Sequence, residues 1–137
     1  MTPLLAVRAA AVTAIAAALP SVKVGPVRTY ARGLADLPAA EVSTPRAVVR
    51  RLEAEGAREL TVTLQVLLMA AGSAPEDTLS PMAETVEAAV LGSEALADLV
   101  DDWRDTSIDF DPGDGAETRP AMLRLMFDAV IYTESTA

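Results

Sequence analysis

The chain has 137 residues, with 20 acidic and 11 basic side chains and a formal net charge of −9. This length suits one domain with one modest core. The acidic balance argues against a nucleic-acid groove or an anionic membrane as a direct partner, because both bind clustered Lys and Arg. The sequence contains no Cys and no His. Disulfides, thiolate nucleophiles and the commonest general base and metal ligand are therefore excluded.

The apolar composition is globular but short of large side chains. Hydrophobic residues make up 51% of the chain and aromatic residues only 4%. A core built from Ala, Val and Leu buries little area per residue, so contact with sister subunits would help to stabilise it. An acidic surface is also compatible with a passage through which DNA slides without being held.

Residues 1–21, MTPLLAVRAAAVTAIAAALPS, predict an amphipathic core helix between Pro3 and Pro20. One apolar stripe at helical spacing contains Leu5, Val12, Ile15 and Leu19, with Leu4, Val7 and Ala11 beside it. A secretory signal is the alternative. It is disfavoured because no Lys or Arg precedes the apolar run and Arg8 interrupts it. The stretch is also too short and too charged to span a bilayer.

The next segments predict strands. Residues 22–33 alternate weakly and favour a short strand that carries Val27 and Tyr30. Within residues 34–52 the chain looks extended up to Pro45, which is suited to an edge strand or a bulge. The clearest strand is residues 59–69. Its inward side chains are Leu60, Val62, Leu64, Val66 and Leu68, and its outward ones are Thr61, Thr63 and Gln65.

A charged turn links these two strands into a long predicted hairpin. Its charged residues are Arg50, Arg51, Glu53, Glu55, Arg58 and Glu59. The ordinary interpretation is a solvated hairpin tip. The functional alternative is an arm of mixed charge that reaches a neighbouring subunit.

Residues 72–93 predict a loop followed by a helix. Three residues can cap this helix: Asp77, Thr78 and Ser80. Pro81 is tolerable only in the first turn. Gly92 is placed to end the helix and Ser93 to begin a short second one. Trp103, the only tryptophan, is more often a core residue than a ligand platform at such a junction.

The last segments predict a second hairpin. Residues 106–111 alternate, with Ile108 and Phe110 on one face. Residues 121–133 alternate with Leu123, Leu125, Phe127, Ala129 and Ile131 on one side. The order of elements predicts a single α+β domain over residues 1–137. Its mostly antiparallel or mixed sheet has about four to five strands, with the N-terminal helix, a central helix and a short helix packed on it.

The turn of this hairpin, DFDPGDGAE at residues 109–117, is rich in carboxylates: Asp109, Asp111, Asp114 and Glu117. It fails as a calcium loop because Gly113 occupies a ligand position and Pro120 stands at the twelfth. A solvated turn is favoured, with Gly113 and Gly115 free to adopt positive φ. Phosphate loops, nucleophile elbows and metal clusters are absent from the sequence. We therefore expect no metal, no cofactor and no catalysis.

The ordered series of segments carries a resemblance. After the first helix come LPAAEV, the charged hairpin, RELTVTLQVLLM, PEDTLSPMAETVEAAV, ALADLVDDW, SIDFD, the acidic turn and AVIYT. This series resembles the tail terminator proteins of long-tailed phages, the family of the lambda minor tail protein U. The match covers most of the chain from Leu37 onward and, more loosely, the first helix. Residues 20–33 have no firm counterpart.

The resemblance implies a structural virion protein of the tail neck, assembled in the cytoplasm of a bacterial host. Such proteins form a ring, expected here to be a hexamer, on the head-proximal end of the tail tube. The ring stops tube growth and offers the surface for head joining. Its partners would be the tail tube protein and a head-completion or connector protein, while DNA passes through without specific binding. No membrane is involved.

Two surfaces are the candidate sites under this resemblance. The hairpin with Arg50, Arg51, Glu53, Glu55 and Arg58 is the candidate contact with a neighbouring subunit or the tube. The acidic turn with Asp109, Asp111 and Asp114 is the candidate lining of the passage.

The source and the rival functions stay open. A composition rich in Ala, Arg and Asp but poor in Lys suggests a phage, prophage or gene transfer agent of a GC-rich bacterium. The nearest rivals are a head-completion protein and a tail-tube subunit, and the more distant one is an exported acidic binding domain.

Overall fold

The computed structural model describes residues 2–27, 36–52, 56–113 and 120–134. The elements in chain order are α1 (Pro3–Ala18), β1 (Lys23–Pro26), β2 (Ala39–Arg51), β3 (Ala57–Ala70), α2 (Pro75–Leu91), α3 (Glu94–Leu99), β4 (Asp102–Asp111) and β5 (Ala121–Glu134). The five strands form one sheet in the order β1-β2-β3-β5-β4. The predicted α+β fold with a mixed sheet is confirmed.

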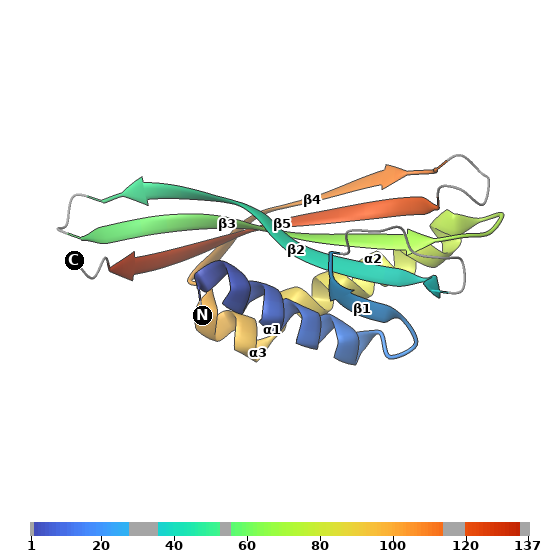
Figure 1. Ribbon diagram of the computed structural model, residues 1–137, viewed down its shortest axis with the longest axis horizontal. Helices are drawn as coiled ribbons and strands as arrows, with labels where there is room; N and C mark the ends of the chain where they lie inside the picture. The colour runs from blue at the N-terminus through green and yellow to red at the C-terminus, as the bar shows by residue number, and fades with distance from the viewer. Residues whose placement is uncertain (1, 28–35, 53–55, 114–119, 135–137) are drawn as a thin grey trace.

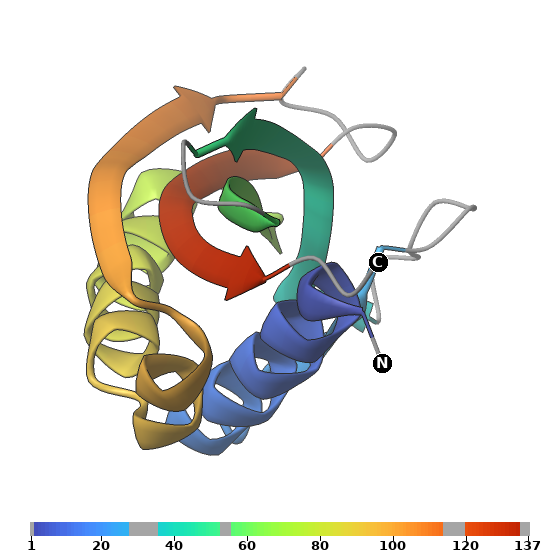
Figure 2. The same ribbon diagram turned by 90° about the vertical axis from the view of Figure 1, so that its left-hand side faces the viewer.

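The sheet is long, strongly twisted and covered on one face only. β1 runs parallel to β2, and the other neighbouring strands are antiparallel. The three helices lie together on one side of the sheet (Figure 1). In the end-on view, β2 and β5 coil around the central β3 (Figure 2). We call the side without helices the open face; it carries Thr61, Thr63 and Gln65 of β3.

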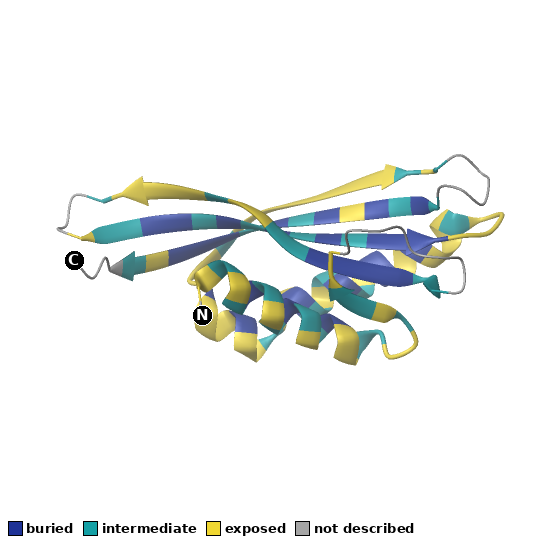
Figure 3. Ribbon diagram, viewed as in Figure 1, coloured by how far each residue is buried: buried dark blue, intermediate teal, exposed yellow. Residues whose placement is uncertain are grey.

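The core lies between the helices and the alternate residues of β3 and β5. The inward residues of β3 are buried: Leu60, Val62, Leu64, Val66 and Leu68. Those of β5 are buried too: Leu123, Leu125, Phe127, Ala129 and Ile131. Burial is concentrated in these two central strands, while β4 is mostly exposed (Figure 3). Both alternating patterns predicted from the sequence are confirmed.

The N-terminal helix forms as predicted but turns a different stripe to the core. Thr2 caps it, since its hydroxyl accepts a hydrogen bond from the Leu5 N–H at 3.3 Å. The buried residues are Val7, Ala11 and Ile15, each four positions after the last. Leu5, predicted on the buried stripe, is exposed. The sequence is so apolar around the helix that its pattern cannot select the face; contact with the sheet and the other helices selects it.

The central helix begins earlier than predicted. Its first residue is Pro75, and Ala74 precedes it without a side-chain cap. The three expected caps therefore lie inside the helix, as does Pro81. Proline is well tolerated at the first helical position, and Glu76 and Asp77 in the first turn face the positive end of the helix dipole. The predictions that Gly92 ends α2 and Ser93 caps α3 are confirmed.

Near the two edges of the sheet, Pro45 and Trp103 take the places predicted for them. Pro45 lies in a β-bulge of β2, between the paired residues Ser43 and Arg46, as a proline in a strand requires. β4 starts at Asp102, before the predicted strand of residues 106–111, and is an edge strand on which Ile108 and Phe110 are exposed. Trp103 packs edge-on against Phe127 with ring centroids 6.0 Å apart, which confirms its role as a core residue.

Residues 22–33 are confirmed only in part as a short strand. β1 ends at Pro26, and Val27 follows it as an exposed residue. Tyr30 lies outside the described residues.

Candidate functional site

The predicted hairpin is the end of a three-stranded projection. β2, β3 and β5 extend past the layer of helices on the side where β2 and β5 end (Figure 1). The four outermost complete rows of this part comprise residues 48–51 of β2, 58–61 of β3 and 130–133 of β5. We call these residues the distal arm. Because β3 is paired on both sides, the arm is a hydrogen-bonded extension of the sheet and not a loose hairpin.

A buried carboxylate joins the strands of the distal arm. Glu59 of β3 has a side chain that is only 6% exposed. Arg50 of β2 donates to its Oε2 at 3.2 Å. Arg104 of β4 donates from Nη1 and Nη2 to Oε1 and Oε2 at 3.4 and 3.3 Å. Glu59 is thus a buried ion-pair centre, which corrects its interpretation as part of a solvated tip.

Arg104 was not among the residues singled out in the sequence. It lies where the β4–β5 register shifts, between Trp103 and Thr106, so its place on the sheet does not follow from simple alternation. A single Arg among four Asp residues of β4 is the only local signal. Its contact with Glu59 depends on the strand order and on the twist of the sheet, which no local pattern encodes.

The outermost complete row of the arm is basic. Arg51 is paired with Arg58, and Arg58 with Thr133. Within the described residues, Arg58 Nε and Thr133 Oγ1 are buried without a hydrogen-bond partner. Glu53 and Glu55 of the predicted interface hairpin lie outside the described residues. The described part of this hairpin therefore presents guanidinium groups.

The distal arm also exposes apolar side chains. Val48 and Val49 of β2 and Tyr132 of β5 are each about half exposed, with Val49 at 51%. Val48 and Val49 are consecutive in a strand, so they point to opposite faces. The arm thus offers apolar surface on both sides in a region that the chain's own helices do not cover (Figure 1).

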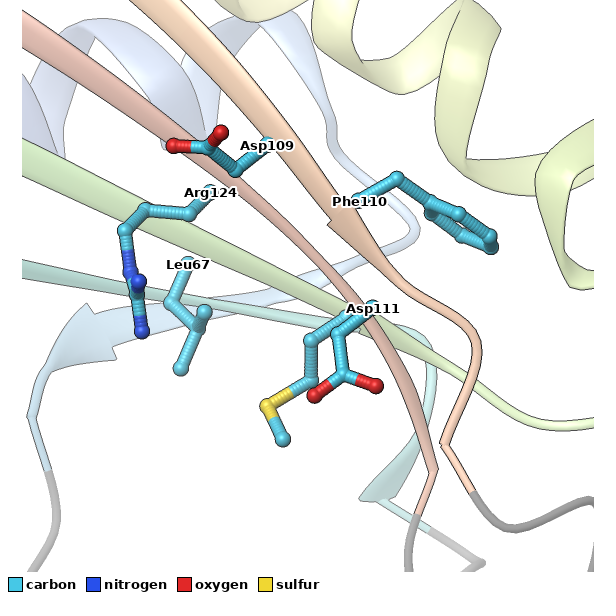
Figure 4. A pocket seen from close by; sticks show the side chains of 6 residues that line it. Leu67, Asp109, Phe110, Asp111 and Arg124 are labelled. Atoms are coloured by element: carbon cyan, nitrogen blue, oxygen red, sulfur yellow. The ribbon is translucent and has the colours of Figure 1, made fainter.

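The second predicted surface is at the opposite end of β4. Asp109 and Asp111 are strand residues, and Asp109 is paired with Arg124 of β5. Together with Leu67, they border a small pocket of about 100 Å³ on the open face (Figure 4). The Phe110 side chain points to the other side of β4 (Figure 4). The carboxylate of Asp111 accepts a hydrogen bond from the Gly113 N–H at 2.9 Å.

The structure describes the acidic turn only as far as Gly113. Gly113 has a positive φ of 74°, as expected for a glycine that turns the chain there. Asp114 and Gly115 lie outside the described residues. The structure therefore places two of the three predicted passage-lining residues, both on the exposed strand and not in the turn.

Within the described ranges, no group of three or more Asp, Glu, His or Cys side chains is placed to hold a metal ion. In the same part of the chain, no helix is long and apolar enough to cross a membrane. No protein-family model matches the sequence, and a search of curated proteins returns no match. The fold and the two surfaces therefore carry the functional argument.

Proposed function

We propose that this chain is the subunit of a finite ring, expected to be a hexamer, at the head-proximal end of a phage-type tail tube. The ring ends tube growth and presents the surface for head joining. The observation that carries this proposal is the distal arm, a hydrogen-bonded extension of the sheet beyond the helices with exposed apolar side chains. The tail terminator resemblance supplies the kind of ring and its place.

The structure of the distal arm favours an oligomer over a monomer. Its central strand β3 is hydrogen bonded to β2 on one side and to β5 on the other, and the Glu59 ion pair with Arg104 connects the arm to β4. Binding a partner therefore orders little new chain, which keeps the entropic cost of association low. Covering each half-exposed valine contributes about 1 kcal/mol, so the arm alone gives a modest gain that repetition around a closed ring multiplies.

The charge of the chain suits a DNA passage. A net charge of −9 per subunit repels phosphate, so a ring of such subunits lets a genome pass without holding it. We assign Asp109 and Asp111 to the lining of this passage, with Asp114 as the third member predicted from the sequence. Neutralising all three to Asn should slow or reduce DNA delivery by assembled particles. Unchanged delivery refutes the lining role but not the ring.

Electron microscopy of the purified chain at high concentration tests the ring. We expect discrete annular particles of one diameter. The double variant Val48→Ser, Val49→Ser should lose them, whereas Leu91→Ser, Leu99→Ser should keep them. The control changes two exposed leucines on α2 and α3, away from the arm.

The location is tested on tailed particles from the source organism, labelled with antibody against the chain. We expect label at the head–tail junction. Label along the tube, together with open polymers of the purified chain, would instead identify a tail-tube subunit. A chain that stays monomeric and is missing from the junction overturns the proposal.

A further inference from the structure

The two edges of the sheet differ in charge. Among the described residues, β1 covers β2 only as far as Val42, so residues 43–51 of β2 have a strand neighbour on one side only. β4 is the strand at the other edge, paired with β5 alone. Each edge presents backbone N–H and C=O groups that can pair with a further strand.

The charges are sorted between these edges by sign. Residues 43–51 carry Arg46, Arg50 and Arg51 and no carboxylate. β4 carries one arginine, Arg104, and the four aspartates Asp102, Asp105, Asp109 and Asp111. Arg50 and Arg104 already bind Glu59, but both remain about half or more exposed. One edge of the molecule is therefore basic and the other acidic.

Both edges also expose large apolar side chains. On β2 these are Val48 and Val49, and on β4 they are Ile108 and Phe110, with Ile108 at 50% exposure. Cross-strand pairs of apolar and of oppositely charged side chains are the units that stabilise sheet pairing. The two edges thus match in both kinds of contact.

From this match we infer that copies of the chain join head to tail, the β4 edge of one copy pairing with the residues 43–51 edge of the next. Charges placed only to block unwanted edge pairing need no sorting by sign, and such edges avoid exposed Val, Ile and Phe. The sorted charges therefore select a second copy of this chain as the partner.

We call this contact between the β4 edge of one copy and the residues 43–51 edge of the next the joint. The strand directions define its geometry. β2 and β4 run antiparallel within one sheet, because each step from β2 through β3 and β5 to β4 reverses direction. A copy that continues the sheet brings its β2 antiparallel to the preceding β4. Such a contact uses two different surfaces, so it closes into a ring when the rotation per subunit divides a full turn. That the ring closes rests on the function proposed above; the pairing of the edges does not.

Pairing along an edge uses backbone groups and leaves side chains on the two faces of the sheet. Asp109 can therefore lie beside the joint and still face the passage. The bulge at Pro45 interrupts the regular pairing of β2. We accordingly place the main contact at residues 46–51, within reach of the exposed valines.

Charge reversal on one edge at a time tests the joint. The first variant is Arg46→Glu, Arg51→Glu, and the second is Asp102→Arg, Asp105→Arg. The sites are exposed, and none has a hydrogen bond or ion pair to another described side chain. Each variant should associate about tenfold or more weakly than the unchanged chain, because like charges then face each other across the joint. Sedimentation velocity measures the mass distribution, and circular dichroism checks the fold.

Mixing the two variants is the decisive measurement. The first variant is acidic at both edges and the second is basic at both edges. Each edge of one variant therefore complements each edge of the other, so their equimolar mixture should regain large particles with both chains in equal number. The reversal Glu84→Arg, Glu87→Arg on α2 is the control and should assemble like the unchanged chain. High salt should weaken assembly of the unchanged chain.

The outcomes separate the two proposals. If the unchanged chain forms rings and both edge variants assemble equally well, the joint is overturned and the ring proposal stands. If the edge variants dissociate alone and recombine on mixing, but tailed particles carry no label at the junction, the joint stands and the tail terminator function falls. An unchanged chain that stays monomeric at high concentration overturns the joint.

Discussion

Glu59 and Arg104 are 45 positions apart in the chain, yet both guanidinium nitrogens of Arg104 donate to the two carboxylate oxygens of Glu59. Glu59 lies on β3 and Arg104 on β4, and β5 separates these strands in the sheet. The contact therefore spans a strand, and with Arg50 it links three of the five strands within the distal arm.

Replacing Arg104 with Ala should lower the free energy of unfolding by about 1–3 kcal/mol, because it leaves a buried carboxylate with one partner. Arg50→Ala should cost less, about 0.5–1 kcal/mol, since Arg50 gives one hydrogen bond and is 67% exposed. Urea unfolding followed by circular dichroism at one fixed protein concentration measures both. Arg8→Ala on α1 is the control and should stay within about 0.5 kcal/mol of the unchanged chain. Equal costs for Arg104 and Arg50 would contradict this account.

Phe127→Ala should cost about 3–5 kcal/mol, because the ring is fully buried in the core and packs edge-on against Trp103. Phe110→Ala removes the same side chain from an exposed position on β4 and should cost under about 1 kcal/mol in a dilute sample. Denaturant unfolding of the two variants makes the comparison. Trp103 fluorescence in native Phe127→Ala should also shift to longer wavelength, as its packing partner is lost. Similar losses for the two phenylalanines would disprove the assignment of the core.

Pro81→Ala should raise the free energy of unfolding by about 1 kcal/mol. Pro81 stands inside α2 and supplies no N–H for the helix, whereas alanine would restore a backbone hydrogen bond. Pro75→Ala is the matched control: at the first helical position the missing N–H needs no partner, so the change should be near zero. Thermal unfolding of the pair separates the two positions. A loss of stability in Pro81→Ala would contradict this reasoning, because the restored N–H would then fail to stabilise α2.

Ser93→Ala should cost about 1 kcal/mol, because the Ser93 hydroxyl accepts the Leu96 N–H at 3.2 Å and begins α3. Ser80→Ala, at an exposed site inside α2, should be neutral or slightly stabilising, since alanine is the better helix former. Chemical unfolding measures both. If Ser93→Ala were also neutral, the cap would contribute nothing and packing of Leu96 alone would hold α3.

Predictions from the sequence succeeded where the spacing of apolar residues was compatible with only one buried face. The alternation from Leu60 to Leu68 marks a strand with a single apolar face, and its partner β5 has the same property. Pro45 was expected at an edge or a bulge and lies in one. Predictions failed where the sequence was compatible with several structures, as for the choice of buried face in the Ala-rich α1 and of the first residue of α2.

The sequence by itself determined the kinds of elements, their order and the two hairpins, because strand alternation, turn residues and helix caps act over a few neighbouring positions. Only the tertiary structure decided that β5 lies between β3 and β4, that β1 runs parallel to β2, and that Glu59 is buried against Arg104. It also decided that the arginines and aspartates of β2 and β4 occupy opposite edges. These relationships join residues far apart in the chain, and they depend on how strands are ordered and twisted when the whole apolar surface is buried together.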